Sequence, residues 1–297
     1  MKPSSLRVEV IAIFGPTASG KSAVAEAVAG RLGTDVVSAD ALQVYRGLEI
    51  LTNQPARPTR LVGIRDVTES MSLGEYAQLA HDAIDELVAA RGAVVVAGGT
   101  GLYLRAALAE LDIPPVVGDD TRRRWEAVYD TGPEAAFALL VELDPAAAAS
   151  IHANDRRRVV RALELTEAGS SLAPPSDGLW AGETRRPTLV VGLELSPDEL
   201  ERRIGARADE MLARGVAEEV RAALERPVSR TARQALGLDE LASLPPEQAR
   251  ARIVVRTRQY ASYQRKWMRR IPGLELVDAE RSPEEVADAV LDLARAR

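Results

Sequence analysis

The chain has 297 residues, 46% of them hydrophobic and 28% charged, with a formal net charge of −6 at pH 7. This length and composition predict a globular protein with a full hydrophobic core, in one large or two small domains, and the absence of cysteine excludes disulfides, thiolate metal sites and a thiol nucleophile. Because no apolar stretch reaches the roughly 18 residues of a membrane span and the first residues are not a secretory signal, we expect a cytoplasmic protein without a membrane partner.

The first motif is a phosphate-binding loop. An apolar run at 8–14 predicts a buried strand, and residues 22–29 favour a helix. Between them the chain fits G-x-x-x-x-G-K-[ST], with Gly15, Pro16, Thr17, Ala18, Ser19, Gly20, Lys21 and Ser22. Backbone N–H groups of such a loop face an anion, Lys21 adds a charge for a terminal phosphate, and the Ser22 hydroxyl can bind Mg²⁺. The motif therefore predicts a bound diphosphate or polyphosphate without identifying the compound.

A second buried strand is predicted at 34–40 and ends in Asp40. An aspartate here serves as a base or a metal ligand in phosphotransferases, whereas many strand-end aspartates only stabilise turns. Both interpretations remain open for this residue taken alone.

A third strand, predicted at 93–97 after an amphipathic helix at 73–90, is followed by Gly98-Gly99-Thr100. Nucleotide hydrolases usually carry an acid here that holds Mg²⁺, so its absence counts against ATP hydrolysis. The Thr100 hydroxyl can donate to an anion or to a leaving oxygen, or the segment is an ordinary turn. Strands that alternate with helices predict an α/β fold, in which a parallel sheet is flanked by helices and ligands bind beyond the carboxyl ends of the strands.

The middle of the chain has a different composition. Alanine- and arginine-rich helical segments reach to about Arg161, and residues 170–187 are typical of a loop. We therefore predict a mostly helical insertion at 113–187 within a core made of residues 1–112 and 188–297. The core continues with a strand at 188–195, a helix capped by Ser196, and helices at about 247–269 and at 283–296.

Two basic segments contrast with the negative net charge. Residues 249–274 contain eight arginine and lysine side chains and no acid, and a second cluster follows Asp155. Such segments can follow a phosphate backbone, although a solvated helix face is the common alternative. Tyr260, Tyr263 and Trp267 are interleaved in the first segment and can stack on bases.

Several motifs together resemble those of the tRNA dimethylallyltransferase family. The resemblance is carried by the phosphate loop and by residues 38–47, 98–104, 151–164 and 257–267, which follow in the family's order and cover most of the chain. It implies a P-loop NTPase-like core that transfers a dimethylallyl group from dimethylallyl diphosphate to N6 of the adenine at position 37, adjacent to the anticodon of tRNA, and releases diphosphate. It also implies Mg²⁺ as cofactor and the tRNA anticodon stem-loop as partner. We expect a monomer.

The resemblance assigns roles to individual residues. Asp40 takes the proton of the adenine amine, Thr100 lies near the leaving oxygen, and the phosphate loop with Ser22 and Mg²⁺ holds the diphosphate. Gln43 is suited to an amide contact with the adenine edge. The helical insertion corresponds to a clamp on the anticodon arm. The residues assigned to tRNA binding are Asp40, Ala41, Leu42, Gln43, Arg157, Arg158, Val159, Val160, Arg161, Arg256, Arg258 and Gln259.

The chain also departs from the family pattern. Residues 50–55 read Ile-Leu-Thr-Asn-Gln-Pro where Ile-Gly-Thr-Ala-Lys-Pro is usual, and Leu238 replaces a common tyrosine. Three alternatives remain: an isopentenyltransferase acting on a free adenine nucleotide, a small-molecule P-loop kinase, and a non-catalytic RNA-binding protein. The two basic segments count against the first, and the missing strand-end acid counts against the second. The phosphate loop with Asp40 has no evident use in the third.

Overall fold

The structure, a computed structural model, describes residues 7–173 and 182–297. The chain divides into two compact units, Met1–Glu110 with Gly182–Arg297 and Leu111–Ala181. Part of the loop expected at 170–187 falls on residues 174–181, which lie outside the described residues. In the part of the chain that is described, no helix is long and apolar enough to span a membrane.

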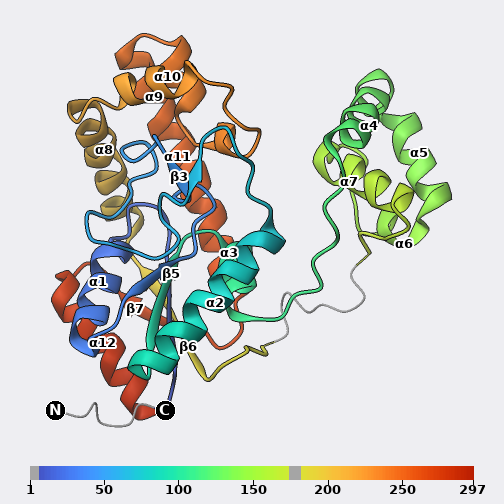
Figure 1. Ribbon diagram of the computed structural model, residues 1–297. Coiled ribbons are helices and arrows are strands. Elements are labelled where there is room, and N and C mark those ends of the chain that lie inside the picture. The colour runs from blue at the N-terminus through green and yellow to red at the C-terminus, as the bar shows by residue number, and fades with distance from the viewer. Residues whose placement is uncertain (1–6, 174–181) are drawn as a thin grey trace. The chain divides into compact units, whose positions relative to one another are not determined.

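The first unit is built on a five-stranded parallel sheet with the order β2-β5-β1-β6-β7 (Figure 1). Because β1 lies in the centre, Val10 pairs with both Val94 of β5 and Thr188 of β6. This arrangement confirms the predicted α/β class with a parallel sheet. The strands are β1 (Val10–Phe14), β2 (Val36–Ser38), β5 (Val94–Gly98), β6 (Thr188–Glu194) and β7 (Glu275–Asp278).

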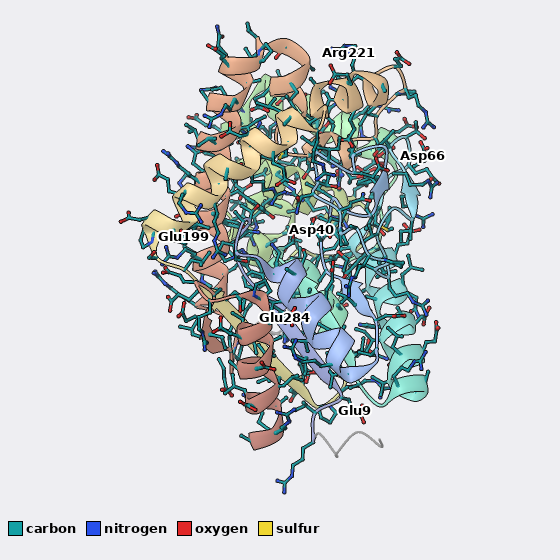
Figure 2. All side chains as sticks on the ribbon, turned by 90° about the vertical axis from the view of Figure 1, so that its left-hand side faces the viewer. Glu9, Asp40, Asp66, Glu199, Arg221 and Glu284 are labelled. Carbon is teal, nitrogen blue, oxygen red and sulfur yellow. The ribbon has the colours of Figure 1, made fainter. Side chains whose placement is uncertain are left out.

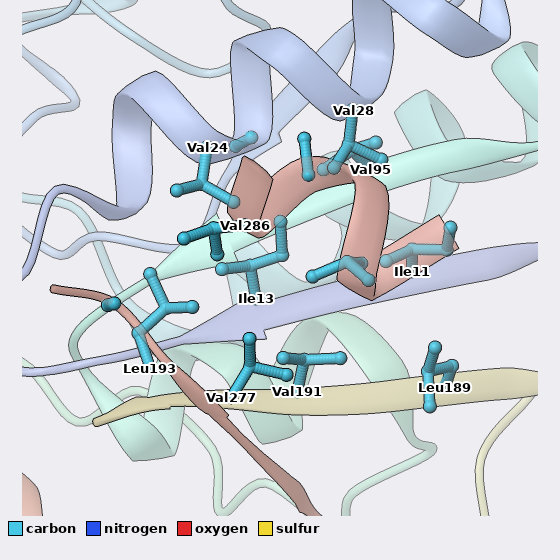
Figure 3. Close-up of a cluster of buried hydrophobic side chains, with 14 of the residues drawn as sticks. Ile11, Ile13, Val24, Val28, Val95, Leu189, Val191, Leu193, Val277 and Val286 are labelled. Atoms are coloured by element: carbon cyan, nitrogen blue, oxygen red, sulfur yellow. The ribbon is translucent and has the colours of Figure 1, made fainter. Parts of the chain in front are cut away.

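Helices cover both faces of the sheet. Side chains of alternate strand residues point to the same face, and on one face Ile11 and Ile13 pack with Val24 and Val28 of α1 (Lys21–Leu32) (Figure 3). Val286 of α12 (Pro283–Ala296) joins this cluster. The other face is covered by α2 (Leu73–Arg91) and α3 (Gly101–Leu108).

The predicted helix boundaries agree closely with the structure where a cap is present. Ser72 accepts a hydrogen bond from the Glu75 N–H at the start of α2, and Ser196 does the same for Glu199 at the start of α8 (Pro197–Ala213). The last helix, α12, matches the prediction at 283–296 and begins with a capping box. Between α8 and α12 the chain forms α9 (Val216–Leu224), a short 3₁₀ helix (Ala232–Gln234), α10 (Leu238–Ser243) and α11 (Pro246–Met268).

Some strands differ from the prediction. The edge strand β7 was not predicted, because Val277 is its only buried residue and the strand carries no apolar run. The strand predicted at 34–40 ends at Ser38, so that Asp40 lies in the loop that follows it. A small second sheet, β3 (Tyr45–Arg46) with β4 (Arg65–Asp66), was also missed.

The second unit is helical, as the sequence predicts for the insertion. Its helices are α4 (Asp119–Thr131), α5 (Pro133–Leu143), α6 (Pro145–Ala148) and α7 (Arg156–Glu167). They enclose a small core of their own, which includes Tyr129, Leu140 and Leu163. Within this unit the buried Glu164 carboxylate accepts hydrogen bonds from Arg122 and Arg161.

Candidate active site

A pocket opens in the first unit, where the phosphate loop and the segment after β2 meet α8 and α11. Figure 2 shows Asp40, which lines this pocket, near the beginning of α1, and Glu9, which precedes β1, near the other end of that helix. The pocket therefore lies beyond the carboxyl ends of the strands, where the α/β fold predicts a ligand. Its lining residues are Thr17, Lys21, Ser22, Asp40, Leu42, Gln43, Leu51, Thr52, Asn53, Ile204, Arg207, Ala208, Met211, Leu236, Ile253, Thr257, Tyr260 and Gln264.

The phosphate loop curls tightly before α1. The Ser19 N–H donates to the Pro16 carbonyl over 3.1 Å, and Ala18 adopts a left-handed conformation with φ 65°. Gly20, the residue before α1, has φ 85°, a value that glycine adopts without strain. This turn brings the first residues of α1, Lys21 and Ser22, to the pocket wall.

Two cations face the pocket. Arg207 of α8 donates from Nη1 to the Thr17 hydroxyl over 2.8 Å. Burial lowers the pKa of Lys21 to about 8, while the Asp40 charge acts in the opposite direction. The pKa of Arg207 is lowered by burial as well. A site with two such cations suits a ligand with several negative charges.

Sequence reasoning missed Arg207. The available signal is its spacing from Arg203, since residues four apart on a helix lie on one face. Arg203 Nη1 donates to the Ser19 carbonyl over 3.4 Å, so both side chains reach the phosphate loop.

Asp40 combines the two interpretations that its sequence context allowed. Its Oδ1 accepts a hydrogen bond from the Leu42 N–H over 3.0 Å, which is a turn-stabilising contact. The same side chain is partly exposed and lines the pocket. A carboxylate held by its own turn in this way is available to accept a proton from a ligand.

Thr100 lies beside the pocket, next to a residue that lines it. Its Oγ1 is 3.3 Å from the hydroxyl of Tyr260 on α11. Although Thr100 precedes α3, its side chain makes no capping hydrogen bond to that helix. Burial, together with the Asp40 charge, raises the pKa of Tyr260 to about 12, so this hydroxyl keeps its proton at neutral pH.

The Gln43 amide is bonded within the protein at both ends. Its Oε1 accepts from the Ser38 hydroxyl over 2.9 Å, and its Nε2 donates to the Asn53 carbonyl over 3.0 Å. Nε2 also faces the Thr52 carbonyl over 3.4 Å, so both of its N–H groups are directed to the protein, whereas Oε1 keeps a second lone pair that can accept from an adenine amine.

Part of the pocket lining is apolar. A Cβ added to Gly237 would lie 3.2 Å from Leu51 Cδ1 and 3.3 Å from Ile253 Cδ1, so these two side chains lie close together. Leu51 belongs to the stretch that departs from the family pattern. Together the uncharged side chains of the lining form an apolar wall. The apolar lining residues are Leu51, Ile204, Ala208, Met211, Leu236 and Ile253.

The basic residues of α11 are partly neutralised by acids from neighbouring helices. Arg256 forms an ion pair with Glu240, and Arg258 forms one with Glu201. Gln259 is exposed. The Trp267 ring packs against the start of α3, because a Cβ on Gly101 would lie only 2.1 Å from it.

The residues of α7 that were assigned to RNA binding differ in exposure. The side chains of Val159 and Val160 are buried in the core of the second unit, so only their backbone is left to contact a bound RNA. Arg157 and Arg158 are exposed. Arg161 is largely engaged within the unit, where it donates to Glu164 and to the Pro115 carbonyl over 2.6 Å.

The fold thus brings the phosphate loop and the 40–43 segment into one pocket and adds residues from α8 and α11 to them. A phosphate loop between the central strand of a parallel sheet and the following helix defines a P-loop NTPase-like protein. The model of one family within this class, IPP transferase, matches residues 43–271. The chain belongs to this family.

Known relatives agree with this assignment. The chain is 38% identical to a tRNA dimethylallyltransferase of Kineococcus radiotolerans, over 96% of both chains, and 39% identical to one of Anaeromyxobacter dehalogenans, over 95% of this chain and 99% of the relative. Among solved structures, the tRNA isopentenylpyrophosphate transferase of Bacillus halodurans superposes with a TM-score of 0.67 at 30% identity, covering 96% of this chain and 95% of that one. A eukaryotic dimethylallyltransferase acting on tRNA gives 0.72 at 26% identity, covering 92% and 74%.

Proposed function

We propose that this protein transfers a dimethylallyl group from dimethylallyl diphosphate to N6 of the adenine at position 37, next to the anticodon of tRNA, and releases diphosphate. The observation that carries the proposal is the convergence of Lys21, Arg207 and Asp40 in one pocket that also has an apolar wall. The names of the relatives support tRNA as the acceptor. A tRNA acceptor favours a cytoplasmic protein, and we propose that the protein acts as a monomer.

The diphosphate of the donor would bind at the phosphate loop. Its charges face Lys21, Arg207 and the beginning of α1, where backbone N–H groups and the helix dipole favour an anion. Charge builds up on the diphosphate as the carbon–oxygen bond breaks, so fixed cations at this position stabilise the transition state more than the ground state. The apolar wall would receive the prenyl group.

Asp40 would act on the nitrogen that attacks the reacting carbon, and Thr100 on the oxygen that leaves it. The exocyclic amine of adenine is a weak nucleophile, and Asp40 would accept the proton that it loses on forming the new carbon–nitrogen bond. The Thr100 hydroxyl would donate to the oxygen that leaves with the diphosphate. The target base must be turned out of the anticodon-loop stack to reach this pocket.

The residues present fit a Mg²⁺ ion that is held mainly by phosphate oxygens and water, with few protein ligands. The described residues hold no cluster of three or more His, Asp or Glu side chains that would enclose a metal ion. Mg²⁺ commonly uses few protein ligands together with water and phosphate oxygens, and the Ser22 hydroxyl lies at the pocket wall beside Lys21. Bound there, Mg²⁺ would neutralise charge on the diphosphate.

The RNA would contact the exposed basic side chains of both units. In the core these are Arg256, Arg258 and the neighbouring Gln259, and in the helical unit they are Arg157 and Arg158. The helical unit is proposed to clamp the anticodon arm.

A transfer assay separates this function from its alternatives. The protein is incubated with Mg²⁺, labelled dimethylallyl diphosphate, and either an unmodified tRNA with adenine at positions 36 and 37, AMP, or no acceptor. We expect label in tRNA alone, and none when guanine replaces adenine 37. Label in AMP but not in tRNA identifies an adenylate isopentenyltransferase and contradicts the proposal. Phosphorylation of a small molecule from ATP, without transfer to tRNA, identifies a kinase. Binding of tRNA without either reaction identifies an RNA-binding protein.

A further inference from the structure

One buried glutamine connects the two loops that border the pocket. Gln264, on α11, is 2% exposed. Its Oε1 accepts a hydrogen bond from the Thr17 N–H in the phosphate loop, and its Nε2 donates one to the Gly99 carbonyl in the turn before α3, each over 2.7 Å. A carboxamide is suited to this position because it offers an acceptor and a donor on one planar group.

The backbone around this amide leaves it little room to move. A Cβ on Gly99 would lie 2.3 Å from Gln264 Nε2, and 3.2 Å from both the Gly15 carbonyl and Lys21 Nζ. Gly99 therefore permits the amide to sit directly on the turn, next to the ammonium group that faces the pocket. Any larger residue at 99 would displace the amide or the loop.

The two hydrogen bonds of Gln264 lie just beyond the end of the β1–β5 pairing, where the sheet no longer holds the two loops together. The register of β1 and β5 ends with Phe14 paired to Gly98, and the phosphate loop and the turn begin immediately afterwards. Gln264 links Thr17 and Gly99 just past this end, although it lies 247 residues from Thr17 and 165 residues from Gly99 in the chain. N–H groups and cations of the protein that are held in place before the ligand arrives need no reorganisation when it binds.

We propose that Gln264 is a positioning residue of the donor site: its amide ties the phosphate loop to the Gly98–Thr100 turn and so holds both in the geometry that receives a diphosphate. This role rests on the proposed use of the pocket for a diphosphate donor. In this role Gln264 acts through the two loops that it joins, although its side chain also lines the pocket.

The test replaces Gln264 by methionine, which keeps the length of the side chain but removes both hydrogen bonds. The binding of inorganic diphosphate with Mg²⁺ is measured by titration calorimetry. We expect Gln264→Met to weaken this binding about tenfold and to raise the KM for dimethylallyl diphosphate by a similar factor, while the KM for tRNA stays within twofold of wild type.

Gln54 offers a matched control. Its Nε2 donates to the carbonyls of Gln43 and Tyr45 over 3.1 and 2.7 Å, and Gln54 is not among the lining residues. Gln54→Met therefore also removes two amide hydrogen bonds, and we expect it to lower the melting temperature without changing diphosphate affinity. Should Gln264→Met fail to fold, Gln264→Asn is used, since an amide one methylene shorter cannot reach both partners.

Diphosphate affinity within twofold of wild type in the folded Gln264 variant overturns the proposal, as does an equal loss in Gln54→Met. The diphosphate binding of the variants can be judged independently of whether the proposed transfer to tRNA is correct. If wild type binds diphosphate but transfers nothing to tRNA, the function is wrong, while the comparison of variants still decides the role of Gln264.

Discussion

The guanidinium of Arg207 donates to the hydroxyl of Thr17 over 2.8 Å, which joins α8 to the phosphate loop. The two residues lie 190 positions apart in the chain, and both line the pocket. The charge of Asp40 also acts on Arg207, where it opposes the lowering of the Arg207 pKa by burial. Arg207 is thus the residue whose removal best tests whether the pocket holds a multiply charged anion.

We expect Arg207→Ala to raise the KM for dimethylallyl diphosphate by about 10- to 100-fold, since charge-assisted hydrogen bonds contribute about 1.5–3 kcal/mol. Arg207→Lys should recover only part of this loss, because an ammonium cannot bond Thr17 and an anion in the planar geometry of a guanidinium. Steady-state kinetics with the donor varied give the measurement. The control is Arg202→Ala on the same helix, whose exposed side chain pairs with Glu199. Equal KM values for wild type and Arg207→Ala would exclude Arg207 from donor binding.

Asp40→Asn should reduce kcat about 10²- to 10⁴-fold, because general base catalysis contributes a factor of this size. Asparagine is the cleaner substitution, since its side-chain oxygen can still accept from the Leu42 N–H and preserve the turn. Rapid-quench measurement of the transfer step, with tRNA affinity measured by filter binding, separates chemistry from recognition. We expect tRNA affinity within threefold of wild type. A variant that transfers at the wild-type rate would show that another group accepts the proton.

The phosphate loop could be predicted from the sequence, whereas the place of Arg207 in the site could not. The phosphate loop and the caps of α2, α8 and α12 are local, because a few consecutive residues determine the backbone that they adopt. Arg207, Tyr260 and Gln264 reach the site only because α8 and α11 pack over the carboxyl ends of the strands. No local pattern encodes that packing.

The stretch 157–161 shows how a helix divides consecutive residues between two faces. The resemblance assigned a continuous stretch, 157–161, to RNA binding, whereas a helix turns consecutive residues to different faces. In α7 the arginines at 157 and 158 are exposed and the two valines enter the core of the unit. The helical period of buried residues would have separated them from sequence alone.

Tyr260 should assist the reaction through Thr100. We expect Tyr260→Phe to lower kcat about 5- to 10-fold, the value of one hydrogen bond of about 1 kcal/mol. In a Thr100→Val background the same change should have no further effect, because its partner hydroxyl is already absent. Stopped assays on the four proteins of this double-mutant cycle measure the coupling.

A matched control for this cycle is Tyr45→Phe. The Tyr45 hydroxyl lies 2.5 Å from the Thr231 hydroxyl, and Tyr45 is not among the lining residues. This variant should unfold at a lower temperature with an unchanged kcat. Independent, additive effects of Tyr260→Phe and Thr100→Val would contradict a shared role.

Lys21 should make donor binding sensitive to pH. Its pKa in the ligand-free protein is about 8, lowered from 10.5 by burial. Binding an anion favours the protonated form, so the lysine takes up a proton when the diphosphate binds above pH 8. Affinity should therefore fall as the pH rises past 8, by up to about tenfold at pH 9.

Diphosphate itself titrates, so wild type is compared with Lys21→Met over pH 6.5 to 9.5. The variant binds more weakly throughout, and we expect its affinity to fall less steeply between pH 8 and 9. Titration calorimetry in buffers of different ionisation enthalpy also counts the protons taken up. Parallel profiles for the two proteins would mean that Lys21 keeps its charge across this range.

Arg258, which is proposed to bind RNA, already forms an ion pair. Its guanidinium pairs with Glu201 of α8, so an RNA phosphate would compete with this carboxylate. Arg258→Ala should weaken tRNA binding and reduce the slope of log K against log salt by about 1. Glu201→Gln removes the competing carboxylate and should instead strengthen binding at low salt. Arg295→Ala, which removes an exposed charge paired with Asp292 on α12, is the control for net charge. Weaker tRNA binding in Glu201→Gln would show that the ion pair holds Arg258 in place for the RNA rather than competing with it.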